Sequence, residues 1–589
     1  MEANVTVQHL RNLSFGWSDY VLFGLLLGVS LMIGIYFGFC SKKQDNTTEY
    51  LLGGKTMSFF PVAMSLIASH ISGISLLGVP VEVYQHGTQY SVCIITSITT
   101  CIVVGYFCLP VFYKLQLTST FEYLELRFAR PVRVLASTLY SIALITYIPL
   151  VVYVPALAFA QATTFDIHVV TPVICIVCIF YTTVGGLKAV VWTDTIQLIV
   201  TIGGLIAVLI LGITAVGGFE KTWQAADEGG RLIFFNMDPS PFTRNTFWCM
   251  SIGALASWVS EYGVSQGSIQ RFLAVPSIGD ARKALVIMAV GNILIKMISM
   301  STGLIMYSKY KDCDPITSKM ISRSDQILPY YVIDVAGKIP GLPGLFLAGL
   351  VSAGLSTMSA SLNTVTGTIY EDFIDPWMPE SNDKEARAAT IMKITVVILG
   401  ILCMTMVFVV TQLGDIFQVS HSLGGITAGP LLGLFLLGLS VPWCTTKGAV
   451  VGGITSLSLM TWIIVGAQWN MFKGKFSYKT LPLSTEGCDQ SLLVNSTVMA
   501  SSYHPEEEDV FPLYRISFMH YTILGAFITI LVGTLASFVL GPRDLKDVDP
   551  DHFAPLIRKF LPRKKYAEVP LDAVEKNKIT EKDDIKDHQ

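Results

Sequence analysis

The sequence predicts an all-α polytopic membrane protein with about thirteen transmembrane helices, arranged as two inverted repeats of five spans. Three observations support this fold class. Of the 589 residues, 52% are hydrophobic and 14% are charged, whereas soluble domains carry about 25% charged residues. Apolar runs of about 20 residues, each sufficient to cross a hydrocarbon core, recur from Tyr20 to Leu540. Two of these runs, five spans apart, are interrupted by polar residues, as in transporters built from inverted repeats.

The apolar runs place the transmembrane domain at residues 19–540. The first run is too long for a cleaved signal peptide and has no basic leader. The predicted spans are Asp19–Phe39, Ser58–Val79, Ser91–Tyr113, Val132–Ala160, Val169–Gly185, Val190–Val216, Thr246–Gly267, Ala284–Tyr307, Leu345–Thr368, Ile391–Gln412, Ile416–Leu439, Gly448–Gln468 and Ile516–Leu540.

The distribution of lysine and arginine orients the protein in the membrane. An odd number of spans places the two termini on opposite sides, and the basic residues of the short loops gather on the side of the tail. The positive-inside rule makes that side cytoplasmic. Residues 1–18 are then extracellular. Residues 541–589 mix acidic and basic side chains with few aromatic ones, so we expect a mostly disordered cytoplasmic tail.

Two covalent modifications are expected on the extracellular side. Asn4, Asn12 and Asn495 lie in glycosylation sequons of predicted outer segments. Of the eleven cysteines, only Cys313 and Cys488 fall in predicted outer loops, which makes a disulfide between them plausible in an oxidising compartment. Spacing alone does not establish this pairing. The other cysteines show no metal-ligand spacing.

The second span is interrupted at the middle of the membrane. Residues Ala68–Ser75 place five polar or glycine residues within an apolar helix: Ser69, His70, Ser72, Gly73 and Ser75. Such an interruption predicts a broken helix, which is tolerated at membrane depth only where it lines a cavity. The alternative is an intact helix with a polar packing face.

A similar interruption occurs five spans later, at Ser257–Arg271, with the sequence S-W-V-S-E-Y-G-V-S-Q-G-S-I-Q-R. Broken first helices in two five-span halves are typical of inverted-repeat transporters. The halves would be Ser58–Val216 and Thr246–Leu439. A pore or a receptor has less reason to break helices in pairs.

The predicted helix Leu342–Asn363 contains a row of small polar residues. Ser352, Ser356, Ser359 and Asn363 recur at four, three and four residues, so they share one helix face. A hydroxyl can return to its own i−4 carbonyl, and small residues also allow close helix packing, so two structural alternatives exist. A cluster of neutral oxygens suits a weakly held monovalent hard cation. The row therefore indicates a sodium site.

Four ionisable residues lie at membrane depth, where such groups are costly and usually functional: His70, Glu261, Lys296 and His421. For each histidine, packing is the simpler interpretation. Glu261 requires a partner, a cation or a proton. The sequence contains no P-loop, no nucleophile elbow and no metal-spaced His/Cys set, so we predict no enzyme and expect energy coupling to an ion gradient.

Several motifs resemble the sodium:solute symporter family, which has a LeuT-like inverted-repeat fold. The resemblance covers nearly all of Asp19–Leu540 and favours the branch of the multivitamin, monocarboxylate and iodide transporters. The motifs are L-G-V-P-V-E-V-Y-Q-H-G-T-Q-Y, L-T-S-T-F-E-Y-L-E-L-R-F, Y-T-T-V-G-G-L-K-A-V-V-W-T-D, Y-G-V-S-Q-G-S-I-Q-R, L-P-G-L-F-L-A-G-L-V-S-A-G-L-S-T-M-S-A-S-L-N and G-P-L-L-G-L-F.

The resemblance implies a sodium site between two helices. Its expected ligands are the hydroxyls of Ser356 and Thr357 and the carbonyls of Ala68, Ile71 and Ala353. It also disfavours a sugar, because Ser75 stands where sugar-transporting relatives have a glutamine. By position, we expect the solute-binding residues to include Gly73, Ser75, Tyr262, Ser359 and His421.

The resemblance also indicates an inner gate. Several relatives close the cavity with an aromatic residue at the position of Glu261, held by a polar residue at the position of His70. Because both positions differ here in complementary ways, we hypothesise a hydrogen-bonded His70–Glu261 gate. The alternative is that Glu261 reaches cytoplasmic water. A carboxylate near the site would repel an anionic solute unless a protonated His70 offsets it, which would make transport pH-dependent.

Together these observations predict a plasma-membrane symporter that imports sodium with a small organic solute. The expected solutes are a monocarboxylate or a carboxylate vitamin, such as lactate, a short-chain acid, pantothenate or biotin. An iodide-like anion symporter and a non-transporting solute sensor are the alternatives. The expected partners are Na⁺, the solute and the lipid bilayer, with no nucleic acid and no obligate protein partner.

Overall fold

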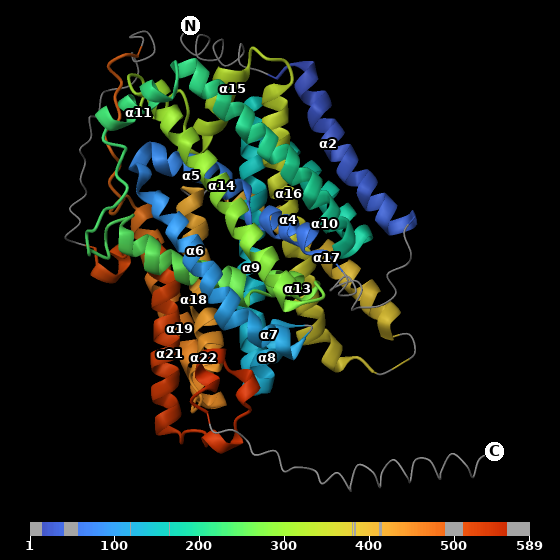
Figure 1. Cartoon of the computed structure of the whole chain (residues 1–589). Coiled ribbons are helices and arrows are strands. Elements are labelled where there is room, and N and C mark those ends of the chain that lie inside the picture. The colour runs from blue at the N-terminus through green and yellow to red at the C-terminus, as the bar shows by residue number, and fades with distance from the viewer. Residues whose placement is uncertain are drawn as a thin grey trace, which may run out of the picture.

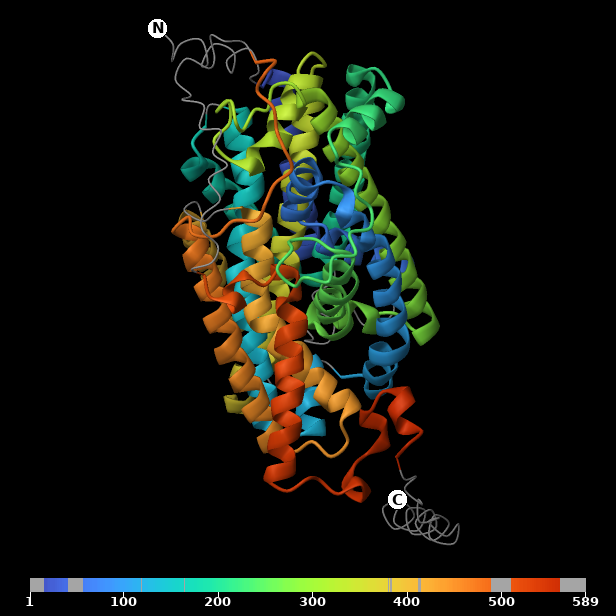
Figure 2. The same cartoon turned by 90° about the vertical axis from the view of Figure 1, so that its left-hand side faces the viewer.

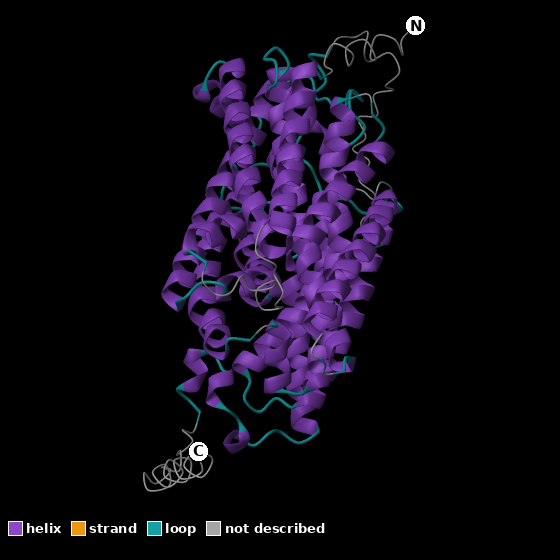
Figure 3. Ribbon diagram, turned by 90° about the vertical axis from the view of Figure 1, so that its right-hand side faces the viewer, coloured by secondary structure: helices purple, strands orange, loops and turns teal. Residues whose placement is uncertain are grey.

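The computed structural model describes residues 15–40, 57–117, 119–163, 165–379, 381, 384–410, 415–488 and 510–561. Within these ranges every regular element is a helix, as Figure 3 shows. The predicted glycosylation sites Asn4, Asn12 and Asn495 lie outside the described residues. The described residues agree with the predicted all-helical membrane protein.

Thirteen crossings were predicted, and the described residues support eleven or twelve of them by helix length and apolar character. Eleven stretches are long and apolar enough to cross a membrane, a bent helix pair adds a twelfth, and the predicted span Thr246–Gly267 is divided into short helical pieces. The long helices are α2 (Trp17–Ile35), α9 (Arg130–Ala162), α10 (Ile167–Val216), α14 (Ile278–Tyr310), α16 (Leu342–Ile369), α17 (Lys384–Val410), α18 (Ile416–Ser440), α19 (Thr446–Phe472) and α21 (Tyr521–Val539).

Two predicted spans fall within the single helix α10. Its apolar stretches Ile167–Val184 and Val190–Val216 match the predicted spans, and helical backbone continues between them. A straight helix of 50 residues would be about 75 Å long, more than twice a hydrocarbon core of about 30 Å. The element therefore contains enough apolar length for two crossings.

The first broken span consists of α4 (Phe59–His70) and α5 (Gly73–His86), bent by 59°. Between them, Ile71 and Ser72 have extended backbone. A Cβ on Gly73 would lie 3.2 Å from Val154 of α9, so glycine allows α5 to start close against that helix. The break predicted within Ala68–Ser75 is confirmed.

The second broken span consists of η5 (Cys249–Gly253), α12 (Ala254–Val259), η6 (Ser260–Val264) and α13 (Gln266–Leu273). The break falls at Ser265, whose backbone is extended and whose hydroxyl accepts a hydrogen bond from the Ser268 backbone N–H at 3.4 Å. That contact caps the new helix. Two π-helical turns, η5 and η6, flank α12, as is frequent at functional sites. The break predicted within Ser257–Arg271 is also confirmed.

The remaining elements surround these breaks. Helix α16 is buried along nearly its whole length and contacts α2, α4, α9 and α10. Helices α18, α19 and α21 pack side by side, and Figures 1 and 2 show them in orange and red along one flank of the bundle. The third span combines α6 (Cys93–Val103), η4 (Val104–Cys108) and α7 (Leu109–Leu115); shorter helices include α8 (Thr120–Arg127), α11 (Phe219–Glu228) and α15 (Ile327–Ala336).

The described part of the tail folds back on the bundle. It contains η13 (Leu545–Asp547), η14 (Pro550–His552) and α22 (Pro555–Arg558). Lys114 at the end of α7 forms an ion pair with Asp551 at 2.5 Å, and the Tyr123 hydroxyl donates to the His552 carbonyl at 2.9 Å. The Ala554 N–H donates to the carbonyl of Leu439 in α18. Residues 541–561 therefore cover the end of α7, α8 and α18.

Candidate functional site

A cavity of about 320 Å³ lies between the two helix breaks. Its walls come mainly from the α4–α5 break, α9, the segment from α12 to α13, α14, α16 and α18. Pockets of this size accommodate small organic ligands. The polar lining combines hydroxyls, an amide and ionisable groups, including Tyr90, Tyr147, Asn292, Ser361 and Thr364.

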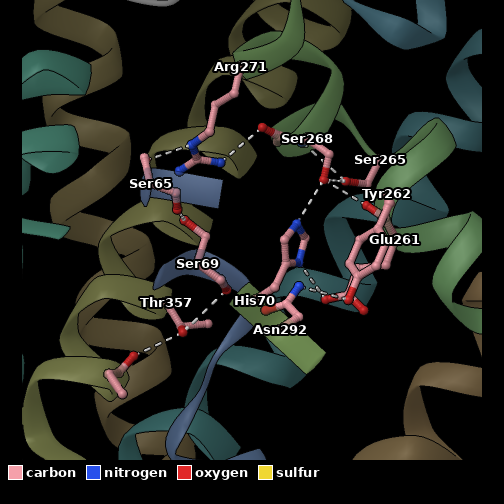
Figure 4. A network of polar contacts seen from close by, with 12 residues as sticks. Ser65, Ser69, His70, Glu261, Tyr262, Ser265, Ser268, Arg271, Asn292 and Thr357 are labelled. Atoms are coloured by element: carbon pink, nitrogen blue, oxygen red, sulfur yellow. Dashed lines mark hydrogen bonds and ion pairs between the residues drawn. The ribbon is translucent and has the colours of Figure 1, made fainter. Parts of the chain in front are cut away.

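His70 and Glu261 meet at the edge of this cavity. Nδ1 of His70 lies 2.9 Å from Oε1 of Glu261, and Nε2 lies 3.2 Å from the hydroxyl of Ser268 (Figure 4). The Ser268 hydroxyl donates its own proton to the Glu261 carbonyl at 2.8 Å, so it accepts from Nε2. An ionised carboxylate only accepts, so both contacts are satisfied together when both ring nitrogens carry a proton. The contact is an ion pair when the imidazole is protonated.

The two partners differ in exposure. The His70 side chain is 9% exposed, whereas that of Glu261 is 48% exposed. The imidazole also packs against the ring of Tyr262, with centroids 4.6 Å apart. His70 is thus fixed by three neighbours, and Glu261 reaches the cavity from the second broken span.

A buried polar chain connects four elements beside the cavity. Nε of Arg271 (α13) donates to the Ser65 hydroxyl (α4) at 3.1 Å, and that hydroxyl donates to Oδ2 of Asp194 (α10) at 3.0 Å. Oδ1 of Asp194 accepts from the hydroxyl of Ser356 (α16) at 2.6 Å. All four side chains are buried. The Ser65 hydroxyl thus bridges the opposite charges of Arg271 and Asp194, and the Ser356 hydroxyl completes the contacts of the carboxylate.

Four of the five predicted sodium ligands surround a second, much smaller cavity of about 10 Å³. Ala68 and Ile71 contribute from the first break, and Ala353 and Ser356 contribute from α16. Gln197 and Thr201 of α10 and Ser352 of α16 complete its polar lining. The fifth residue, Thr357, lines the large cavity instead; its hydroxyl donates to the Ala353 carbonyl at 3.0 Å and lies 3.4 Å from the Ser69 carbonyl (Figure 4).

The predicted solute-binding residues divide into two groups. Ser75, Tyr262 and His421 line the large cavity. Gly73 and Ser359 do not line it: Gly73 packs against Val154, and the Ser359 hydroxyl donates to the Ser356 carbonyl at 3.0 Å, so their assignment to solute binding stays a prediction.

A charged cluster joins the far end of α5 to α18. The guanidinium of Arg244 donates to both carboxylate oxygens of Glu82, at 2.8 and 2.7 Å. It also donates to Gln418 at 2.8 Å and lies 3.6 Å from Asp415, which caps α18. Bidentate contacts of this kind fix geometry strongly. The cluster therefore holds α5, α18 and the segment before η5 together.

The loops beyond this cluster are also connected. Cys313 and Cys488 form a disulfide with a Cα–Cα distance of 4.8 Å, across 175 residues of sequence. The disulfide that the loop positions of these two cysteines made plausible is therefore present in the structure.

Sequence reasoning missed Asp194 and Arg271. Both lie in or beside apolar helical segments, and ionisable residues at membrane depth are the signal that could have identified them. Lys296 was recognised as an intramembrane charge, but no role followed from the sequence. In the structure it lines the large cavity.

Comparisons with known proteins agree with this arrangement. Residues 50–456 match the family model "Sodium:solute symporter family". Sodium-coupled monocarboxylate transporter 2 of Mus musculus is 38% identical over 577 residues, covering 98% of this chain and 92% of that protein. Sodium-coupled monocarboxylate transporter 1 of Homo sapiens is 38% identical over 546 residues, covering 90% and 88%.

Two further similarities extend the comparison. The putative sodium-dependent multivitamin transporter of Drosophila melanogaster is 36% identical over 571 residues, covering 94% of this chain and 93% of that protein. Among solved structures, a Na⁺-coupled sialic acid symporter in a substrate-bound outward-open state has a TM-score of 0.73 at 23% identity. The alignment covers 90% of this chain and all of that one, which establishes a shared fold.

Proposed function

The chain belongs to the sodium:solute symporter family, and we propose that it carries sodium and a small carboxylate solute together into the cell. The names of its relatives support this solute class, because they specify monocarboxylates and multivitamins. The proposal includes a plasma-membrane location. It also places the N-terminus outside, an orientation that follows from the distribution of basic residues. In this orientation the Arg244 cluster lies on the outer side of the cavity.

The observation that carries the proposal is the small cavity between the first break and α16. About one water-sized particle fits in 10–15 Å³, and this cavity of about 10 Å³ is lined by oxygen-bearing groups. The hydroxyl of Ser352 is buried there with no hydrogen-bond partner among the described residues. Hard cations prefer oxygen ligands. The residues present therefore fit a sodium ion.

The proposed ligands around this cavity are the carbonyls of Ala68, Ile71 and Ala353 and the hydroxyl of Ser356. The fifth predicted ligand, the hydroxyl of Thr357, lies on the large cavity and stays a prediction. The neighbouring carboxylate of Asp194 is hydrogen-bonded to Ser356, so the surroundings are less neutral than the predicted cluster of hydroxyls and carbonyls. An anion next to the site strengthens the attraction for a cation. Part of that charge is offset by Arg271, which is connected to Asp194 through Ser65.

Coupling follows from the position of this site. The proposed sodium site lies between α16 and the first helix break. The same break supplies Ser69, His70 and Ser75 to the large cavity. Sodium binding would hold the break against α16 and thereby favour the conformation in which the solute cavity is complete. One ligand then raises the population of the state that the other binds, and the effect is reciprocal.

The membrane potential supplies additional driving force. Each net positive charge moved inward gains roughly 2.3 kcal/mol per 100 mV. The volume and lining of the large cavity support an organic solute in preference to a single inorganic anion, because hydrogen-bonding groups surround space for several non-hydrogen atoms.

A panel of uptake measurements tests the proposal. Cells expressing the full chain are given radiolabelled lactate, nicotinate, pantothenate, biotin or iodide, with sodium and then with choline as the external cation. We expect sodium-dependent uptake of at least one carboxylate and none of iodide. Matched cells without the protein provide the control. Uptake of iodide alone, or carboxylate uptake that is the same in choline, would overturn the proposal.

A further inference from the structure

Lys296 presents a positive charge to the large cavity from the middle of a membrane helix. Asn292, Ile295, Lys296 and Ser299 of α14 follow helical spacing and all line this cavity. At 1.5 Å per residue, Lys296 lies about 27 Å from one end of the helix and about 21 Å from the other. Its side chain cannot extend to either membrane surface, so the charge must be accommodated inside the protein.

The ammonium of Lys296 rests on an aromatic ring. Nζ lies 3.4 Å from the centroid of the Trp258 ring, in a cation–π contact. Within the described residues it makes no ion pair and no hydrogen bond. An ammonium has three N–H donors, and the face of a ring replaces only part of its hydration. Donors of Lys296 are therefore left for a group inside the cavity.

The other charged side chains of the cavity have partners. Glu261 is bound by His70 at 2.9 Å, and Arg271 donates to Ser65 and to the Gly267 carbonyl. Glu261 and Lys296 line the same cavity. Arg271 is also offset by Asp194 through Ser65. Lys296 is therefore the cavity cation for which the described residues provide no directly bonded opposite charge. An anionic group of the solute would balance that charge.

We propose that Lys296 binds the carboxylate of the transported solute, with its ammonium held in place by the Trp258 ring. This inference rests on the proposed function, which supplies the carboxylate. Glu261, held by His70, is a second polar group on the cavity wall, where a hydroxyl or amide N–H of the solute can donate to it. The preferred substrate class is a small acid with one carboxylate and a hydrogen-bond donor at some distance from it.

Acid and amide pairs test the inference without any substitution. The probe is the carboxylate with the fastest sodium-dependent uptake in the panel, and its primary amide is the competitor. The amide has the same shape and lacks the charge. We expect the acid to inhibit uptake of labelled acid at a concentration at least about 10-fold lower than the amide does, because bonds to charged groups exceed neutral ones. Equal inhibition by the two would overturn the inference.

Substitutions assign the preference to Lys296. In Lys296→Gln the KM for the acid should rise at least about 10-fold, with little change in the sodium concentration for half-maximal uptake. Lys296→Arg should keep most of the affinity. Lys283→Gln, an exposed lysine on the same helix, should behave like the unaltered chain. If Lys296→Gln is not delivered to the surface, Lys296→Met gives the same uncharged test.

The double variant Lys296→Gln/Glu261→Gln separates solute binding from a purely structural role. If Lys296 only neutralised Glu261, removal of both charges would restore the acid's KM. A bound carboxylate instead predicts a KM that stays high and an acid-to-amide preference near one. An acid preference that survives in Lys296→Gln overturns the inference and leaves symport intact. Absence of sodium-dependent carboxylate uptake by the unaltered chain instead removes the proposed function.

Discussion

Nδ1 of His70 lies 2.9 Å from Oε1 of Glu261, although 191 residues separate them in sequence. His70 is the last residue of α4, and Glu261 lies in η6, next to the second break. The contact thus joins corresponding interrupted helices of the two predicted repeats. The hypothesised inner gate would use this contact, because its release would let the two half-helices separate.

The first prediction concerns the energy of this contact. His70→Ala and Glu261→Gln should each lower the free energy of unfolding, because the first leaves Glu261 without its donor and the second weakens the bond by removing the charge of its acceptor. The double variant should be no less stable than the less stable of the two single variants. Its loss is then smaller than the sum of the single losses, by a coupling energy of about 0.5–3 kcal/mol. Thermal unfolding of the purified protein measures it. The exposed Lys283–Asp280 pair provides the control and should show almost no coupling. Additive losses at His70 and Glu261 would contradict a gate pair.

The second prediction concerns the sodium site. Ser356→Ala and Thr357→Ala should each raise the sodium concentration for half-maximal uptake by at least about 10-fold, a loss typical for contacts at metal sites. Surface expression should be retained, because Ser356→Ala removes one oxygen atom and Thr357→Ala removes one oxygen atom and one methyl group. Thr368→Ala is the control: it lies on the same helix about 16 Å from Thr357. Unchanged sodium dependence in both serine and threonine variants would refute the assignment.

The third prediction concerns the buried chain from Arg271 to Ser356. Asp194→Asn keeps a hydrogen-bond acceptor for Ser356 but leaves the charge of Arg271 in the interior without an opposite charge. The expected loss of unfolding free energy is about 3–5 kcal/mol. Combining it with Arg271→Gln should recover part of that loss, as measured by thermal unfolding in the same detergent. A further loss in the double variant would show that the two charges do not compensate each other.

The fourth prediction concerns pH and the outer loops. Asp325, in η7 (Ser324–Gln326), is buried and accepts a hydrogen bond from the Ile416 backbone. Burial and the neighbouring charge of Asp415 raise the pKa of Asp325 to about 7. The folded state therefore favours the protonated form. This contribution to stability is complete below the unfolded pKa near 4 and is lost as the pH rises through about 7.

The corresponding experiment compares Asp325→Asn with the unaltered chain across that range. The asparagine stays neutral and can still accept from Ile416. Its unfolding temperature should exceed that of the unaltered chain by a margin that grows between about pH 5 and about pH 8. Arg323 and Arg244, which also approach this acidic pair, remain charged throughout. A margin that does not change with pH would contradict the shifted pKa.

Much of the fold could be predicted because it is encoded locally. Apolar length identified the spans, and α18 begins at Ile416, where the sequence placed it. The helix breaks were recognisable because serine and glycine residues interrupt apolar runs at Ile71–Ser72 and Ser265. The division of Ile167–Val216 into two separate helices was not reproduced, since helical hydrogen bonding continues through that segment.

The site was less predictable, because its residues depend on tertiary neighbours. Helix α16 is buried on all sides, so it has no exposed face and helical periodicity cannot show which residues meet the cavity. Ser361 lines it, whereas Ser359 does not. Asp194 and Arg271 become partners only through Ser65 of a third element, and no sequence spacing reports such a contact.

The most direct test of the central claim is the reciprocity of sodium and solute binding on the purified protein. Equilibrium binding of the labelled carboxylate is measured in sodium and in choline, and sodium affinity is measured with and without saturating carboxylate. The account predicts that each ligand raises the protein's affinity for the other by the same factor, at least about fivefold. Ser356→Ala should reduce both effects. Carboxylate binding with the same Kd in sodium and in choline would contradict the account.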